Sequence, residues 1–169
     1  SGHQAPVSSM TAWQRDAVSA FIALGANLGD AAATVRRAID GLAQLPQTQL
    51  LAWSPLYASA PVDAQGPDYV NAVAQVRTGL TAPELLQHLG QAELQAGRTR
   101  PYHHAPRTLD LDLLLYGDGR IGSDALTLPH PRMAQRAFVL LPLADIAPQR
   151  VSPEALRAVA GQAIRRLPG

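Results

Sequence analysis

The sequence predicts an α+β fold in which two helices cover one face of a β-sheet. Four segments have the length, the β-forming residues and the bounding glycines and prolines of strands. Two further segments repeat apolar residues at the three- and four-residue intervals of a helix. The strands are expected within 17–24, 50–57, 69–77 and 106–116, and the helices within 31–45 and 81–97. This β-α-β-β-α-β order, followed by a C-terminal extension, is typical of a ferredoxin-like sandwich.

The first strand is expected to be covered on both faces, because 17–24 is almost wholly apolar. Asp30 follows a glycine-rich turn and is expected to cap the first helix, which Pro46 closes. That turn lacks the G-x-G-x-x-G order, which disfavours a dinucleotide site. The segment 50–57 contains Pro55, so an edge or bulged strand is expected there.

A long loop at 58–68 leads into the strand at 69–77, whose residues alternate in character. Tyr69 and Asn71 fall on one face of that strand, because alternate side chains point the same way. An aromatic ring for stacking and an amide for hydrogen bonding suit a flat heteroaromatic ligand. A surface tyrosine and a turn asparagine explain the pair equally well, and the residues alone leave both interpretations open.

The second helix is expected to begin at a capping box formed by Thr81 and Glu84 and to end at Gly97. Glu93 lies on or beside the apolar stripe of this helix. There it braces an arginine, binds a hydroxyl group or is simply solvated. The segment 98–106 is cationic and lacks core residues, so a mobile loop is expected.

Two carboxylates mark the fourth strand, between Pro106 and Gly117. Asp110 and Asp112 share a face, with Cα atoms about 7 Å apart. Three leucines, Leu109, Leu111 and Leu113, take the other face and anchor it in a core. An edge strand with a polar outer face is the alternative interpretation. Like charges on one face repel, however, which favours a site for hard cations, next to the anion-binding Arg107.

The chain after the fourth strand supplies basic residues and more apolar surface. By their spacing, His130, Arg132 and Arg136 are expected near one another. The remaining elements are predicted as a turn at 117–119, a hairpin arm or loop at 121–128, an apolar segment closing the core at 138–146 and a short amphipathic helix at 153–166.

Composition bounds the class of protein. The 169 residues predict one domain over 17–169, preceded by a disordered leader over 1–16 that begins with a tag remnant. The net charge of +1 makes no case for nucleic acid or an acidic membrane. No segment approaches the roughly 20 apolar residues of a membrane span, and no signal peptide is evident. The chain has no cysteine, which excludes disulfides, thiol nucleophiles and thiolate metal sites, and a cytoplasmic location is expected.

All 14 basic residues are arginine, and lysine is absent. This absence excludes a Walker-type P-loop, Schiff-base chemistry and the lysine of protein kinases. Any phosphate handling must therefore rely on arginine, histidine, backbone amides and metal.

A carboxylate pair beside clustered arginines favours magnesium, which keeps water ligands and takes substrate phosphates as further ligands. Arginine neutralises a transferring phosphoryl group and binds it bidentately. Together they favour phosphoryl or pyrophosphoryl transfer from a nucleotide. Three alternatives remain: a zinc site using His103, His104 and His130, a nucleic-acid-binding module, and a two-metal nucleotide phosphodiesterase.

The stretch 103–114, His-His-Ala-Pro-Arg-Thr-Leu-Asp-Leu-Asp-Leu-Leu, resembles the signature of the 6-hydroxymethyl-7,8-dihydropterin pyrophosphokinase (HPPK) family. The resemblance continues at 22–29, 66–72, 93–98 and 128–130 and covers about 18–150. It implies an ATP-dependent diphosphotransferase of folate biosynthesis. Such an enzyme moves the β,γ-pyrophosphate of ATP to the hydroxymethyl oxygen of the pterin and releases AMP.

The resemblance also implies site residues and partners. Asp110 and Asp112 match the ligands of two Mg²⁺ ions, and either carboxylate is a candidate proton acceptor. The ATP side is implied to comprise Glu93, Arg98, Arg107, Leu113, Thr127 and His130, of which Arg98 and Arg107 are also catalytic. The pterin side is implied to comprise Ser59, Ala60, Val62, Tyr69, Asn71, Asp112 and Phe138. Arg100 and Arg136 match loop-closure positions. ATP and the pterin are the expected partners of a monomer, without nucleic acid or membrane.

Three departures from the family pattern are evident. The loop between Arg100 and Arg107 is one residue shorter than in the best-known members. His104 stands where those members place a tryptophan that covers the pterin, and Pro131 stands where a tyrosine follows the histidine. These differences affect the seal of the closed state and one phosphate contact.

Overall fold

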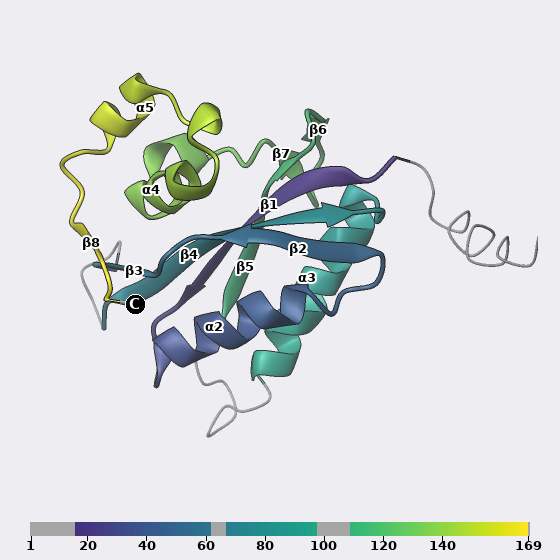
Figure 1. Ribbon diagram of the computed structural model, residues 1–169, viewed down its shortest axis with the longest axis horizontal. Helices are drawn as coiled ribbons and strands as arrows, with labels where there is room; N and C mark the ends of the chain where they lie inside the picture. Colours follow the sequence, from purple (N-terminus) through teal and green to yellow (C-terminus); the bar gives the residue numbers. More distant parts are fainter. Residues whose placement is uncertain (1–15, 62–66, 98–108, 169) are drawn as a thin grey trace, which may run out of the picture.

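The computed structural model describes residues 16–61, 67–97 and 109–168, and these form an antiparallel sheet packed between two layers of helices (Figure 1). The elements are β1 (Val18–Ala26), α2 (Ala31–Leu42), β2 (Thr48–Trp53), β3 (Tyr57–Ser59), β4 (Tyr69–Thr78), α3 (Ala82–Gly97), β5 (Asp110–Tyr116), β6 (Ile121–Gly122), β7 (Thr127–Leu128), η1 (Met133–Gln135), α4 (Ala137–Ile146), η2 (Pro148–Arg150), α5 (Pro153–Ala158) and β8 (Ile164–Arg166).

The main sheet has six strands in the order β5-β1-β4-β3-β8, and β2 also pairs with β4. Every pairing is antiparallel. The central strand β1 is buried along most of its length, as its apolar sequence predicts. A mixed fold of helices and an antiparallel sheet is thus confirmed, and the first, third and fourth predicted strands correspond to β1, β4 and β5.

The two faces of the sheet carry separate cores. The helix-side core lies toward α2 and α3 and includes Ile22, Ala74, Leu85 and Leu111. The α4-side core lies on the other face and includes Phe21, Val73, Leu114 and Leu143. Figure 1 shows α2 and α3 together on one side of the sheet and α4 and α5 on the other. The α4 layer covers only part of its side of the sheet. The uncovered part of that sheet face holds the cavity described below.

The predicted helix starts are confirmed in detail. The N–H of Ala33 donates to the Asp30 carboxylate at 3.1 Å, so Asp30 caps α2. Thr81 and Glu84 exchange hydrogen bonds, with the Thr81 N–H donating to Glu84 at 2.7 Å and the Glu84 N–H to Thr81 at 3.1 Å. This is the reciprocal geometry of a capping box. It fixes where α3 begins. The described part of α3 extends to Gly97, and the residues needed to test the predicted helix end lie outside the described residues.

The prediction of one helix over 153–166 is wrong. Only α5 is helical, capped by the Ser152 hydroxyl, which accepts from the Ala155 N–H at 3.0 Å. The chain then turns, and β8 pairs with β3. The side of β3 that faces away from β4 has backbone N–H and C=O groups that need partners, and residues 164–166 supply them as the strand β8 instead of continuing the helix.

The segment 50–57 is two strands rather than one. Ser54 still pairs with Val73, since its N–H donates to the Val73 carbonyl at 2.9 Å and its hydroxyl accepts from the Val73 N–H at 3.0 Å. Pro55 has no N–H to donate, and β2 and β3 separate at this point. Both then lie along the same side of β4.

The remaining expectations concern two later segments, the leader and membrane spans. The apolar segment 138–146 is the helix α4, and within 121–128 the short strands β6 and β7 pair with each other. Residues 1–15 of the expected leader lie outside the described residues. In the described part of the chain, no helix has the length and apolar character needed to cross a bilayer.

Candidate active site

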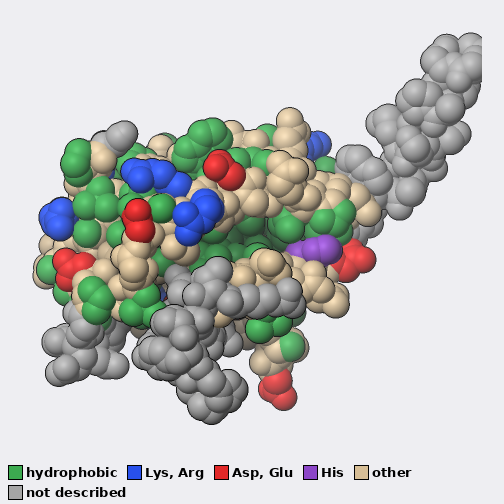
Figure 2. All heavy atoms as spheres, turned by 90° about the horizontal axis from the view of Figure 1, so that it is seen from below, with side chains coloured by type: hydrophobic (Ala, Val, Ile, Leu, Met, Phe, Trp, Pro, Cys, Tyr) green, Lys and Arg blue, Asp and Glu red, His purple; other side chains and the backbone are tan. Residues whose placement is uncertain are grey.

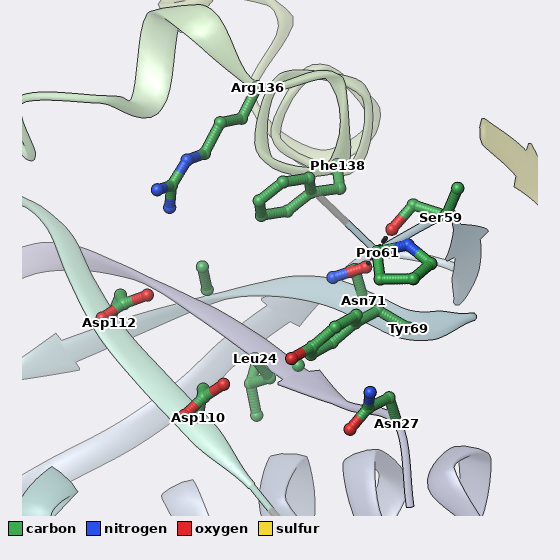
Figure 3. Close-up of a pocket in the computed structure, with 13 residues that line it drawn as sticks. Leu24, Asn27, Ser59, Pro61, Tyr69, Asn71, Asp110, Asp112, Arg136 and Phe138 are labelled. Carbon is green, nitrogen blue, oxygen red and sulfur yellow. Dashed lines mark hydrogen bonds between the residues drawn. The ribbon is translucent and has the colours of Figure 1, made fainter. Parts of the chain in front are cut away.

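A cavity of about 320 Å³ opens on the sheet face opposite α2 and α3 (Figure 3). Its wall combines residues from β1, β3, β4, β5 and the start of α4. The lining comprises Ala23, Leu24, Gly25, Asn27, Ser59, Ala60, Pro61, Tyr69, Asn71, Asp110, Asp112, Arg136 and Phe138. In the space-filling view of Figure 2, one face has a hollow with hydrophobic side chains at its base and arginine and histidine side chains around it.

The two carboxylates of β5 stand on one wall of the cavity. Across the β1 pairing, Asp110 is opposite Gly25 and Asp112 is opposite Ala23, and both aspartates are exposed. Figure 3 shows their side chains leaving the strand on the same side. The intervening Leu111 is buried in the helix-side core. The predicted alternation is therefore confirmed, and the cores on both faces hold the carboxylates in place.

Magnesium fits this donor set. Among the described residues no group of three or more His, Asp or Glu side chains gathers to enclose a metal ion. Two exposed carboxylates supply hard oxygen ligands and leave the other coordination positions to water and substrate oxygens. Mg²⁺ prefers this arrangement to an all-protein cage.

Glu93 reaches from α3 to the strand between the two aspartates. Its carboxylate accepts a hydrogen bond from the Leu111 N–H at 2.7 Å. A charged acceptor makes this bond stronger than one between neutral groups. Of the roles left open by the sequence, bracing is nearest to what is found, but the braced group is the backbone of β5.

A ring-sized space separates two aromatic side chains on the other wall. Figure 3 shows Tyr69 and Phe138 on opposite sides of the cavity, with Asn71 between them. Asn71 is only 5% exposed, and its Oδ1 accepts from the Ser59 hydroxyl at 2.9 Å. The amide is therefore a buried, oriented group, which overturns the interpretation of Asn71 as a turn residue.

Glycine at position 25 leaves room for this amide. A Cβ atom on Gly25 would stand 3.4 Å from Asn71 Nδ2 and 4.0 Å from the Tyr69 ring. With the Asn71 oxygen held by Ser59, the NH₂ group faces bare backbone at the base of the cavity. It keeps donor capacity for a ligand.

Arg136 joins the two walls. Its guanidinium lies 5.4 Å from the centroid of the Phe138 ring. In Figure 3 the side chain extends from the α4 end of the cavity toward the side that carries Asp112. A fixed cation is thus placed between the ring space and the carboxylates.

His130 is held close to β5. The backbone N–H of His130 donates to the Leu114 carbonyl at 2.9 Å. On the ring, Nδ1 accepts from the backbone N–H of Arg132 at 3.2 Å. Partial burial lowers the pKa of His130 below its usual value, Arg136 and Arg132 lower it further, and Asp112 opposes them. The imidazole is therefore neutral at pH 7, with its proton on Nε2, which can donate to an anion.

The structure places the other predicted residues less uniformly. Ser59 and Ala60 line the cavity. Thr127 is exposed on β7 and donates to the Ser123 carbonyl at 3.4 Å. Leu113 is 2% exposed in the helix-side core, so its side chain faces away from the cavity. Val62, Arg98, Arg100, His103, His104 and Arg107 lie outside the described residues.

The lining also contains residues that the sequence analysis did not assign, namely Ala23, Leu24, Gly25, Asn27 and Pro61. Most belong to the end of β1 and the turn that follows it. A glycine-rich turn directly after a buried strand was the available signal. The family resemblance at 22–29 also covers this turn but assigns no role to a single residue there, and the position of the turn beside β5 depends on strand order.

Comparison with known proteins identifies the family of this chain. The model of the 7,8-dihydro-6-hydroxymethylpterin-pyrophosphokinase (HPPK) family matches residues 21–148. A 2-amino-4-hydroxy-6-hydroxymethyldihydropteridine pyrophosphokinase of Pseudomonas aeruginosa is 44% identical over 156 residues, which span 88% of this chain and 96% of that one. An enzyme of the same name from Haemophilus influenzae is 43% identical over 137 residues, 80% of this chain and 86% of its own.

Solved structures support the fold. Wild-type Plasmodium falciparum HPPK-DHPS with pterin and p-hydroxybenzoate superposes with a TM-score of 0.58 at 14% identity, over 80% of this chain. The match spans 40% of that longer chain, so it concerns the fold of one part only. Because the family model matches well over half of the residues and two relatives exceed 40% identity, the chain belongs to the HPPK family.

Proposed function

We propose that this protein transfers the β,γ-pyrophosphoryl group of ATP to the hydroxymethyl oxygen of 6-hydroxymethyl-7,8-dihydropterin, a step of folate synthesis. The names of its relatives point to this reaction. The observation that carries the proposal is the shared cavity, in which the Tyr69–Asn71–Phe138 wall and the Asp110–Asp112 wall face one space. A ring held on the first wall presents its substituent to the second.

The pterin binds between the Tyr69 and Phe138 rings. Offset stacking on both faces of a flat heterocycle adds to the gain from apolar burial. The Asn71 NH₂ group donates to an acceptor on the ring edge, while Ser59 holds the amide in that orientation. A site that hydrogen-bonds the ring discriminates strongly against rings that lack the matching acceptor. Ser59, Ala60 and Val62 form the adjoining loop edge of this pocket.

The phosphates bind on the charged wall. Asp110 and Asp112 would hold two Mg²⁺ ions, which when bound would neutralise phosphate charge and favour ionisation of the nearby hydroxyl group. His130 donates from Nε2 to a phosphate oxygen, and Arg136 neutralises charge between the two substrates. Arg98 and Arg107 complete the phosphate grip, and Arg100 acts in loop closure. These three roles rest on the family pattern alone.

The chemistry follows from the placement. The hydroxymethyl oxygen attacks the β-phosphorus, forming one O–P bond while the bond from that phosphorus to the α,β-bridging oxygen breaks. AMP leaves with the bridging oxygen. The hydroxyl proton passes to the carboxylate of Asp112 or Asp110. Positioning and electrostatic stabilisation supply most of the acceleration in such transfers.

The nucleotide pocket extends along α3 and β5. Glu93, Leu113 and Thr127 belong to it by family resemblance. Glu93 acts through the backbone of β5, which it holds at Leu111. Leu113 contributes packing beneath the strand, since its side chain lies in the helix-side core.

The proposal includes the architecture around the site. We assign the sheet to the ferredoxin-like type, because its central path β5-β1-β4 with β2 beside β4 has the strand order of that sandwich. Residues 17–169 act as one domain and as a monomer. An ATP-consuming step of folate synthesis fits a cytoplasmic location.

AMP release tests the function directly. The protein is incubated with ATP and Mg²⁺, with and without the hydroxymethyl pterin, and the nucleotides are separated. AMP is expected only when both substrates and the metal are present, in a one-to-one ratio with pterin diphosphate. Nucleotide hydrolysis without pterin would instead identify a two-metal phosphodiesterase. Salt-sensitive binding to RNA without turnover would indicate a nucleic-acid module.

A further inference from the structure

The start of α4 carries two residues of the cavity but lacks a cap of its own. Arg136 stands at the N-cap position and makes no side-chain capping bond, and Phe138 lies in the first turn. The first N–H groups of a helix have no partner within the helix. The Val139 N–H donates to the Arg136 carbonyl at 3.1 Å, and the Ala137 N–H takes its partner from another segment of the chain.

Gln162 supplies the missing partner from the C-terminal segment. Its Oε1 accepts from the Ala137 N–H at 2.9 Å, and its Nε2 donates to the Gln135 carbonyl at 2.8 Å. The two bonds lie on either side of Arg136 in the sequence. One planar amide thus pairs with the backbone as a neighbouring strand would, and it fixes the peptide groups that flank Arg136.

The segment that carries Gln162 is itself anchored to β3. Two residues later, Ile164 pairs with Ser59 in the β3–β8 ladder. Arg166, at the end of β8, forms an ion pair with Asp145 of α4 at 3.3 Å. The C-terminal segment therefore links β3, where Ser59 orients Asn71, to the start of α4.

We propose that Gln162 is a positioning residue for pterin binding, which holds Arg136 and Phe138 in register with Ser59 and Asn71. This inference rests on the proposed function. Gln162 does not line the cavity between Tyr69 and Phe138. It acts through the backbone on both sides of Arg136. Its loss is expected to affect the pterin more than ATP, because Phe138 belongs to the pterin side and Arg136 lies between the two substrates.

The test compares Gln162→Met with Ser152→Ala. Methionine keeps the length of the side chain and removes both hydrogen bonds. Ser152→Ala removes the cap of α5 in the same C-terminal region and leaves the Arg136 backbone intact. For each protein we measure the melting temperature, the KM values for pterin and ATP, kcat, and the Kd of the pterin in the absence of ATP.

Gln162→Met is expected to raise the pterin KM and Kd about fivefold, the loss expected from part of two hydrogen bonds, with smaller changes in the KM for ATP and in kcat. Ser152→Ala is expected to lower the melting temperature without changing either pterin value. Wild-type pterin binding by Gln162→Met, or an equal effect of Ser152→Ala, contradicts the inference.

Two further outcomes are separable. If Gln162→Met does not fold, Gln162→Glu retains the acceptor for Ala137, whereas its second oxygen cannot donate to the Gln135 carbonyl and repels it. This variant is then expected to weaken pterin binding about twofold. If the wild-type protein itself releases no AMP with both substrates, the proposed function fails. If it releases AMP and the Gln162 variants bind pterin normally, the positioning role alone fails.

Discussion

The two walls of the cavity differ in how far their polar side chains are buried. On the ring wall, Asn71 and Ser59 are 5% and 6% exposed and hydrogen-bond each other. On the phosphate wall, Asp110 and Asp112 are exposed. A buried amide without a partner is costly, so it must be paired before any ligand arrives. An exposed carboxylate keeps much of its hydration and carries no such requirement.

The difference indicates two modes of recognition in one cavity. The ring wall is preorganised and selects a shape with a matching hydrogen-bond edge. The phosphate wall is a set of charges whose geometry is completed by metal and nucleotide. Substitutions on the first wall should therefore affect stability and pterin affinity together. Substitutions on the second should affect turnover with little effect on stability.

The largest effect is expected from Asp110→Ala or Asp112→Ala. Turnover should fall by at least about 100- to 1,000-fold, because the transferring phosphates lose their metal-mediated stabilisation. The melting temperature should stay the same or rise slightly, since two like charges no longer face each other. AMP release and thermal unfolding measure the two effects. Asp124→Ala, in the exposed β6–β7 turn, is the control; near-normal AMP release by either site variant would refute the metal assignment.

A smaller effect on turnover, now with a loss of stability, is expected from Asn71→Ala. The pterin KM should rise by about 10- to 100-fold, and the free energy of unfolding should fall by about 1–3 kcal/mol, because the Ser59 hydroxyl loses its buried acceptor. Gln75→Ala is the matched control. Gln75 is an amide on the same strand and face, bonded to Ser19 at 3.3 Å outside the cavity. Equal pterin KM values for the two variants would remove Asn71 from ring recognition.

The smallest effect is expected from Tyr57→Phe, behind the ring wall. The Tyr57 hydroxyl donates to Asp145, next to Arg166. Burial raises the pKa of Tyr57, and the bond to Asp145 raises it further, while Arg166 lowers it. A raised folded-state pKa stabilises the protein fully below the unfolded value of 10.0, and this stability is lost as the pH rises through the folded-state pKa.

Tyr57→Phe should therefore lower the free energy of unfolding at pH 7 by about 1 kcal/mol and flatten its decline above pH 10. The absence of lysine leaves few other groups to titrate in this range. Denaturant unfolding at a series of pH values measures both changes. Tyr116→Phe, which removes a hydroxyl bonded to the Leu80 carbonyl, controls for loss of a hydrogen bond at neutral pH. An unaltered alkaline decline in Tyr57→Phe would count against the role of this phenol.

Local periodicity explains what the sequence could predict. The two-residue repeat of a strand placed Asp110 with Asp112 and Tyr69 with Asn71, and the capping residues located the helix starts. Which strands lie side by side is a non-local property. That β1 stands between β4 and β5, so that both pairs face one cavity, depends on long-range pairing with no local signal.

The same reason accounts for what was missed. The strand β8 is three residues long and pairs with a strand about a hundred positions earlier in the chain. Its arginines resemble a helix C-terminus, and Ser152 with Pro153 is a genuine helix start. Gln162 was not assigned a role because no local sequence pattern around it indicates that it contacts the backbone next to Arg136.

The three consecutive leucines of β5, Leu113, Leu114 and Leu115, have the same hydropathy but differ in strand pairing and in the core that they join. Leu113 pairs with Ile22 and Leu115 with Phe21, which leaves Leu114 as the extra residue of a bulge. Leu113 packs on the helix side, and Leu114 and Leu115 both pack toward α4. Leu114 has no partner residue in the ladder with β1, and its carbonyl accepts from the backbone N–H of His130. Removing one leucine would restore a regular ladder with nearly unchanged composition, and it would detach the histidine from the strand that carries the aspartates. A point substitution in this run would change the volume that one core must fill, whereas a deletion would change which residues face each core.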